Sequence, residues 1–473
     1  MNCSVGGMNG REGSDSMNGA SCENMAGWVD SQERTCEAYE EDWWLCVTAV
    51  FDADAENISA VEACCSCGGG SDYTPATLSA SFFDASVVRY PSSYSYAATY
   101  ETRSLTPAPG NSVGTATFFI IDISATESID KKYAGGVLGP DGIVYFVPYD
   151  ADKIGVLNPA KRTLTTIDIA ATISGLKKYA GGVLGPNGIV YFVPYDADRI
   201  GVLNLMLHWM KKEDEYNYLE NITTFTTIDI SATISGTGKY LGGVLGPDEI
   251  VYMVPHNADK IGVLNPATQT FTTIDIAATV SGLNKYAGGV LGLDGIIYMV
   301  PFIADKIGVL NPATQTFTIM DATISGTEKY YGGVLGPDGI IYMVPFRANN
   351  IGVLNPATKT FTTIDIAWGL NKYVGGVLGP DGIVYFVPAY ANKIGVLNPA
   401  TQTFSTIDIA ATISIPNKYW GGVLGPNNKV YMVPRNADNI MELQLGNIER
   451  AYEMAGGVPE AWRALLSPHF NKF

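Results

Sequence analysis

The sequence has little charge and few histidines, and it contains no long apolar run. Charged residues make up 16% of the 473 residues, against about 25% in a typical soluble domain, which argues against a disordered chain or a coiled coil. No run of about 18 apolar residues occurs, so no transmembrane helix is expected. The N-terminus lacks the apolar stretch of a signal peptide. A net charge of −18 disfavours a nucleic-acid partner.

Cysteine is absent after residue 67, which confines any disulfide chemistry to the N-terminal part of the chain. Six of the seven cysteines are Cys22, Cys36, Cys46, Cys64, Cys65 and Cys67. This density predicts a disulfide framework and hence a secreted protein. The neighbouring Cys64 and Cys65 need different partners, and the connectivity stays open. A zinc site is the alternative; no histidine lies nearby, and eleven acidic residues surround the thiols.

One repeat organises the remainder of the chain. The phrase Lys-Tyr-x-Gly-Gly-Val-Leu-Gly occurs seven times, at intervals of 43, 44 or 46 residues apart from one of 61. Each copy parses into four short strands, which in the first copy are 135–139, 143–147, 153–157 and 163–169. The Asp-Gly after the first strand indicates a type I′ hairpin turn. A four-stranded meander of this length is typical of one β-propeller blade.

The ends of the repeat region predict a closed ring. The last copy has strands at 421–425, 430–434 and 440–444 but no fourth strand, whereas 117–123 is a fourth strand with no blade before it. Placing 117–123 in the last blade completes seven blades and removes the free sheet edges. The predicted fold class is therefore all-β: a seven-bladed β-propeller with an N-terminal strand closing the last blade, plus a small disulfide-rich module.

The domain prediction follows from these features. We expect a disordered N-terminus at 1–21, the six-cysteine module at 22–67, a linker at 68–114, the propeller at 115–445 and a helical tail at 446–473. We expect a monomer. The long repeat interval comes from an insertion at 205–220, which is either an arm for a partner or a retained intron in the gene model.

A lysine precedes the repeated tyrosine in every copy. The blade-to-blade connections that carry it share one face of the propeller with the loops between second and third strands, and long loops on a rigid scaffold usually carry function. One interpretation is a ring of lysines that attracts an anionic ligand to the channel mouth. The interpretation we favour is that each lysine pairs with a loop carboxylate and holds adjacent blades together. The candidates are Lys132, Lys178, Lys239, Lys285, Lys329, Lys372 and Lys418.

Aromatic and planar polar residues recur in the same second-to-third-strand loops. They follow the proline that ends each second strand, and we expect them to be exposed. Such side chains suit stacking on a sugar or a protein hot spot, while ordinary variation at loop tips is the alternative. The candidates are Tyr149, Tyr195, His256, Phe302, Arg347, Tyr390 and Arg435. Asn57 and Asn221 begin glycosylation sequons, which matter in a secreted protein.

Signals for catalysis are weak. The three histidines, His208, His256 and His469, share no motif, so a histidine-based metal site is not expected. No nucleophile elbow, P-loop or dinucleotide fingerprint occurs in a suitable context. The Gly-Pro-Asp-Gly turns lack the alternating carboxylates of calcium loops. We therefore expect no cofactor, with a structural divalent metal as a minor alternative, and lean against an enzyme.

The repeat, G-G-V-L-G-P-D-G-I-V-Y-F-V-P followed by I-G-V-L-N-P-A-T, resembles the blades of the streptogramin lyase (virginiamycin B lyase-like) family over roughly residues 115–445. That resemblance implies the propeller fold. Lyases of the family use a histidine, a glutamate and a magnesium site near the channel, and no residues here match them, since only His256 lies in a candidate loop. The segment 22–67 loosely resembles small six-cysteine, ShK-like modules of secreted proteins.

Together these features predict an extracellular or cell-surface binding protein that uses one propeller face to recognise a glycan or a protein. A propeller-type lyase or hydrolase with an unrecognised site at the channel mouth is the alternative. An architectural matrix protein is the third hypothesis.

Overall fold

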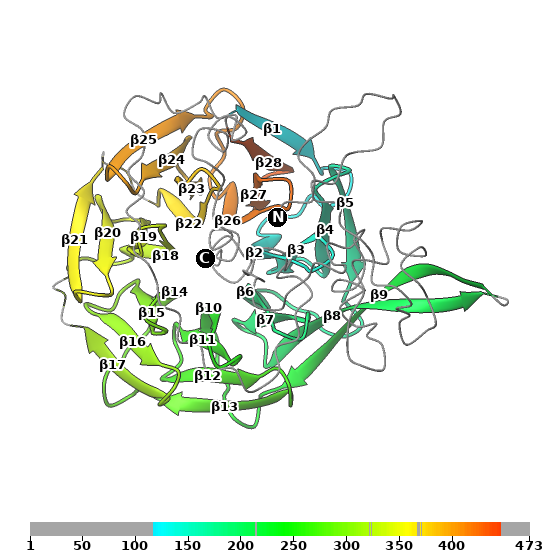
Figure 1. The fold of residues 1–473 in the computed structure, drawn as a ribbon, viewed down its shortest axis with the longest axis horizontal. Coiled ribbons are helices and arrows are strands. Elements are labelled where there is room, and N and C mark those ends of the chain that lie inside the picture. Colours follow the sequence, from blue (N-terminus) through cyan, green and yellow to red (C-terminus); the bar gives the residue numbers. More distant parts are fainter. Residues whose placement is uncertain are drawn as a thin grey trace, which may run out of the picture. The chain divides into compact units, whose positions relative to one another are not determined.

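The computed structural model describes residues 117–445 apart from 213–214, 321, 323, 367–368 and 370, and for residues 206–222 it describes the backbone alone. The predicted cysteine module, linker and tail, and Asn57, lie outside this range and remain predictions. The described elements are all β-strands, which form seven four-stranded sheets around one axis (Figure 1). The seven-bladed β-propeller predicted from the sequence is confirmed.

Blades 1 to 6 each consist of four consecutive strands that run outward from the axis, and blade 7 takes its outer strand from the start of the described chain. The innermost strands are β2 (Tyr133–Leu138), β6 (Tyr179–Leu184), β10 (Tyr240–Leu245), β14 (Tyr286–Leu291), β18 (Tyr330–Leu335), β22 (Tyr373–Leu378) and β26 (Tyr419–Leu424). The second strands are β3 (Val144–Pro148), β7 (Val190–Pro194), β11 (Val251–Pro255), β15 (Ile297–Pro301), β19 (Ile341–Pro345), β23 (Val384–Pro388) and β27 (Lys429–Pro434).

The third strands are β4 (Lys153–Asn158), β8 (Arg199–Lys212), β12 (Lys260–Asn265), β16 (Ile307–Asn311), β20 (Asn350–Asn355), β24 (Lys393–Asn398) and β28 (Asn439–Gln444). The outer strands are β5 (Thr163–Asp168), β9 (Glu215–Asp229), β13 (Thr270–Asp275), β17 (Thr316–Met320), β21 (Thr360–Asp365), β25 (Thr403–Asp408) and, in blade 7, β1 (Thr117–Asp122).

Strand β1 closes the ring, as the sequence predicts. It pairs antiparallel with β28, from Thr117 opposite Gln444 to Asp122 opposite Asn439 (Figure 1). Ile121 on this strand is buried in a cluster to which blade 7 and blade 1 both contribute. The closing strand is therefore fixed by a backbone ladder and by apolar packing.

The two glycines of the repeat have separate structural roles. The first, Gly135 in blade 1, has a φ of +92° at a bulge where the register between β2 and β3 shifts. The second lies where two blades approach closely. A Cβ on Gly182 would lie 2.7 Å from Cγ2 of Val137 and 3.1 Å from Cγ2 of Val147, both in blade 1. The same contact recurs at all seven interfaces, so the second glycine sets the spacing of the blades.

The hairpin turn between first and second strands differs from the predicted type. In blade 1 the amide of Gly142 donates to the Gly139 carbonyl at 3.1 Å, and only Gly142 of the central residues has a positive φ, of +73°. A type I′ turn needs positive φ at two positions, so this is a type I turn followed by a left-handed residue. Asp141 fixes it, because its Oδ2 accepts a 2.7 Å hydrogen bond from the Tyr145 hydroxyl.

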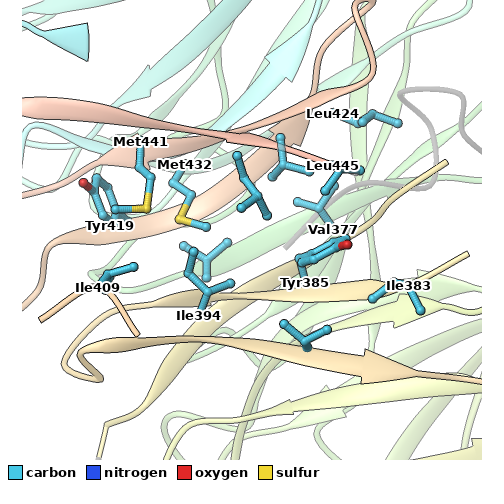
Figure 2. Packing of buried hydrophobic residues seen from close by; sticks show 14 of the residues in the cluster. Val377, Ile383, Tyr385, Ile394, Ile409, Tyr419, Leu424, Met432, Met441 and Leu445 are labelled. Atoms are coloured by element: carbon cyan, nitrogen blue, oxygen red, sulfur yellow. The ribbon is translucent and has the colours of Figure 1, made fainter. Parts of the chain in front are cut away.

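The hydrophobic core lies between the blades. Figure 2 shows one interface, where Val377, Tyr385 and Ile394 of blade 6 meet Tyr419 and Met441 of blade 7. The second-strand tyrosines take part in these interfaces, as Tyr385 does here. Each interface repeats this pattern with small changes, which explains why one sequence motif is sufficient for the whole ring.

The insertion at 205–220 continues the outer hairpin of blade 2. Strands β8 and β9 pair antiparallel from Arg199 opposite Asp229 to Lys212 opposite Glu215, with one register shift between Met210 and Lys211. They extend beyond the rim of the ring (Figure 1). The sequon residue Asn221 lies on β9. In the described part of the chain, no helix is long and apolar enough to cross a membrane.

Candidate functional site

Two repeated positions bring side chains to the axis at one face of the ring. One is the residue after the second-strand proline and the other follows the first-strand tyrosine. The amide of Tyr149 donates to the Lys132 carbonyl at 2.9 Å, which holds the start of each second-to-third-strand loop against the start of the first strand. We call the resulting group the axial cluster. It comprises Ala134, Tyr149, Ala180, Tyr195, Leu241, His256, Ala287, Phe302, Ile303, Tyr331, Phe346, Val374, Ala389, Trp420 and Arg435.

Aromatic rings of successive blades form a chain around the axis. Their centroids are 5.7 Å apart for Tyr149 and Tyr195, 5.9 Å for Tyr195 and His256, and 5.6 Å for His256 and Phe302. These separations are in the range of favourable aromatic pairs. The chain continues from Phe302 to Phe346 at 6.0 Å. Five consecutive blades thus contribute one ring each.

Blade 6 interrupts this chain because Ala389 occupies its position. The gap is filled from the first strands of blades 5 and 7. The rings of Tyr331 and Trp420 lie perpendicular with centroids 5.2 Å apart, and the indole Nε1 donates to the Tyr331 hydroxyl at 3.0 Å. Trp420 stays partly exposed, as does Tyr195. The cluster therefore gathers aromatic side chains at the axis and leaves Tyr195 and Trp420 partly open to solvent.

Arg435 of blade 7 completes the cluster beside blade 1. Its guanidinium carbon lies 3.6 Å from the centre of the Trp420 ring and 4.4 Å from that of Tyr149. The residue is 5% exposed, and its Nε and Nη1 have no hydrogen-bond partner. No ion pair joins Arg435 to an acidic side chain within the described ranges. The guanidinium is thus a buried cation that packs against two aromatic rings, with two of its three nitrogens unpartnered.

The groups around Arg435 are uncharged near neutral pH. Burial raises the pKa of Tyr149 to about 12, although the neighbouring Arg435 cation acts in the opposite direction. Burial also raises the pKa of Tyr195 and of Tyr331, and it lowers the pKa of His256. At pH 7 the phenols are protonated and the imidazole is neutral. Arg435 is therefore the only charged member of the axial cluster.

The seven candidate lysines lie between blades and face away from open solvent. The Nζ of Lys285 donates to the carbonyls of Gly282 at 2.6 Å and Asn257 at 3.1 Å, and it forms a 3.1 Å salt bridge with Asp259 of the preceding blade. Equivalent salt bridges join Lys132 to Asp438, Lys178 to Asp152 and Lys239 to Asp198. All seven lysines are at most 6% exposed. Four of the seven lysines thus form the pairs with loop carboxylates that the inter-blade interpretation describes.

The remaining three lysines, at the interfaces of blades 4 to 7, rely on backbone carbonyls. Lys329 donates to the carbonyls of Ile303 and Gly326, and Lys372 to that of Gly369. Lys418 donates to the Ile415 carbonyl at 2.9 Å. Burial without an ion pair lowers the pKa of each lysine, and that of Lys418 falls to about 8. Ion pairs with these lysines therefore contribute less to the interfaces of blades 4 to 7 than to the other interfaces.

We expect Lys285→Met to destabilise the protein by about 2 kcal/mol, because it leaves two carbonyls and a carboxylate without their donor. Asp259→Asn is expected to cost less than about 1 kcal/mol, because this carboxylate is 57% exposed and solvent screens the pair. Asparagine occupies the same loop position in blades 5 and 6, at Asn349 and Asn392. Urea unfolding of both variants measures the difference. Equal losses in the free energy of unfolding would contradict the expectation that the carbonyl contacts of Lys285 contribute more than its ion pair.

The structure brings together five of the seven loop candidates. Tyr149, Tyr195, His256, Phe302 and Arg435 meet in the axial cluster, and they are buried or half-buried. The prediction that these side chains are exposed was wrong, because the residue after the second-strand proline points to the axis.

Arg347 and Tyr390 lie one position further along their loops and are exposed. Arg347 forms an ion pair with Glu328 at 2.9 Å. Three aromatic members of the cluster, Tyr331, Phe346 and Trp420, were not among the predicted site residues. Aligning the two axial positions across all seven copies would have identified them.

Within the described residues, no group of three or more histidine, cysteine, aspartate or glutamate side chains could hold a metal ion.

No protein-family model matches the chain, and no curated protein matches it in sequence. Solved structures do match. A streptogramin B lyase superimposes with a TM-score of 0.55 and 19% identity, over 71% of this chain and 100% of that one. Virginiamycin B lyase from Staphylococcus aureus gives 0.53 and 17% identity, over 70% and 99%.

An extracellular domain from B. thetaiotaomicron, described as part of a one component system, gives a TM-score of 0.51 at 12% identity. The match covers 71% of this chain and 43% of that one. These likenesses show a shared propeller fold. The chain is a seven-bladed β-propeller similar in fold to streptogramin B lyase.

Proposed function

We propose that the chain is an extracellular or cell-surface binding protein whose propeller recognises a glycan at the mouth of its central channel. The observation that supports this proposal is the axial cluster, which gathers aromatic rings from most of the blades on one face. The partly exposed Tyr195 and Trp420 offer ring surfaces to a ligand. Aromatic faces of this kind stack well against the apolar side of a sugar ring.

The scaffold supports binding because it fixes these rings in advance. The residues of the axial cluster belong to strands or to loops whose backbone amides bond the neighbouring strand, as at His256 N to the Lys239 carbonyl, 2.9 Å. A preformed site loses little conformational entropy when a ligand binds. Extracellular placement rests on the cysteine-rich segment 22–67, and the proposed ligand class rests on the aromatic surfaces.

We expect Trp420→Ala to weaken glycan binding by about tenfold or more, because it removes the largest partly exposed ring. The experiment is a glycan array probed with the full-length protein, followed by titration of the strongest ligand. Tyr195→Phe is a second variant that keeps the ring and should bind. Tyr390→Ala, at an exposed position outside the cluster, is the matched control. The proposal fails if no glycan binds or if Trp420→Ala binds unchanged. Conversion of the bound glycan would instead favour the lyase or hydrolase alternative.

A further inference from the structure

Arg435 is the one charge in the axial cluster, and nothing in the described chain neutralises it. Buried ionised side chains are normally paired with an opposite charge or have all their polar atoms bonded. Here the Nε and Nη1 of a residue that is 5% exposed have no partner. The buried lysines nearby behave differently, since each ammonium group bonds one or more carbonyls or a carboxylate. Arg435 therefore has unused capacity to bind an anion.

The aromatic contacts of the guanidinium leave Nε and Nη1 as hydrogen-bond donors for that anion. The rings of Trp420 and Tyr149 lie against the group at 3.6 and 4.4 Å. Charged N–H donors of this kind bind the oxygens of a carboxylate or sulfate.

The surroundings also favour a single anionic group over a polyanion. The seven lysines are engaged between blades, so Arg435 is the only cation that the axial cluster offers. Tyrosine hydroxyls and the neutral imidazole of His256 add hydrogen-bonding capacity without charge. One cation among aromatic rings suits a sugar that carries one acidic substituent better than a peptide with several acidic side chains.

We propose that the axial cluster binds an acidic saccharide, with Arg435 receiving the carboxylate or sulfate and with Trp420 and Tyr195 contacting the sugar ring. This inference rests on the proposed glycan-binding function and names the ligand class. Nε and Nη1 are buried, so the acidic group reaches them only when the partly exposed Trp420, which packs directly against Arg435, moves aside.

The test is calorimetric titration of the full-length protein with four probes: a neutral disaccharide extended by one galacturonate residue, a monosulfated disaccharide, neutral maltotriose and a triglutamate peptide. We expect an acidic saccharide to bind about tenfold or more tightly than maltotriose, the size of effect typical of a charge-assisted hydrogen bond. Arg435→Met should abolish this preference. It should also stay folded, because removing an unpaired buried cation relieves its desolvation. Arg347→Met, which changes an exposed loop arginine, is the matched control and should keep it.

Three results would overturn the inference. Equal binding of maltotriose and the acidic saccharides would remove the anion preference while leaving the glycan-binding function intact. If Arg435→Met binds the acidic saccharide as tightly as the unmodified protein, and its melting temperature rises as much when the ligand is added, the anion binds at another position. If triglutamate binds more tightly than the acidic saccharides and Arg435→Met abolishes that binding, the ligand class is an acidic peptide and not a saccharide. Failure of every saccharide, on the array as well, would overturn the proposed function itself.

Discussion

Gly182→Ala is expected to destabilise the propeller by about 3 kcal/mol, because the added methyl group has no room. Its Cβ would lie 2.7 Å from Cγ2 of Val137 and 3.1 Å from Cγ2 of Val147. Both valines belong to blade 1, so relief requires the two blades to move apart. The ring resists such a movement, since every blade is packed on both sides. Urea unfolding of the purified protein measures the loss.

Val137→Ala provides the control for this prediction, because it removes the methyl group that the new Cβ would meet. Val137 is buried, so Val137→Ala alone should also be destabilising. Combined with Gly182→Ala it should restore space, and the double variant is expected to be more stable than the sum of the single losses by at least about 1 kcal/mol. Strict additivity of the two losses would show that crowding between blades is not the cause.

Ile121→Asp is expected to release the closing strand, with a loss of about 4 kcal/mol, because it places an unpaired carboxylate in an apolar interface. Ile121 is 8% exposed and packs in the cluster shared by blades 7 and 1. Losing the β1–β28 ladder would leave β28 as a free edge, so we also expect aggregation on heating. Differential scanning calorimetry with light scattering follows both effects.

Thr117→Asp is the matched control, since Thr117 is an exposed residue on the same strand. It should change the free energy of unfolding by less than about 0.5 kcal/mol. If Ile121→Asp melts like the unmodified protein and stays monomeric on heating, the closing strand contributes little to the stability of the ring. A large effect of Thr117→Asp would instead point to a general weakness of β1 to added charge.

The fold could be predicted because the same pattern of strand and turn residues occurs in seven copies. The alternation of short β-branched runs with Gly, Pro and Asn turns defines four strands per copy, and the unmatched strand 117–123 defines the closure. The turn type was not predictable from Asp141 and Gly142 alone. The dipeptide occurs in several turn types, and the hydroxyl of Tyr145, which bonds Asp141 from the next strand, helps to fix the one observed.

The candidate site was predictable only in part, because strand periodicity does not show which loop residues turn toward the axis. Tyr149 and Arg347 look alike in sequence as loop residues, yet one lies in the axial cluster and the other is exposed. They differ by one position after the proline. The repeated lysines also fit two interpretations, since a conserved spacing in seven copies describes a ring of ligand-binding groups as well as a ring of inter-blade contacts.

The closing pair of strands has a mechanical consequence. Because β1 and β28 are antiparallel, Thr117 lies opposite Gln444, so the chain enters and leaves the propeller at the same end of one ladder. A force that separates the two flanking segments therefore acts on the last pair first and opens the ladder one pair at a time. Strands loaded at opposite ends would share the force over all their hydrogen bonds. Packing on both sides of each blade therefore stabilises the ring against heat. A pulling force on the two flanking segments, in contrast, breaks the residue pairs between β1 and β28 one after another.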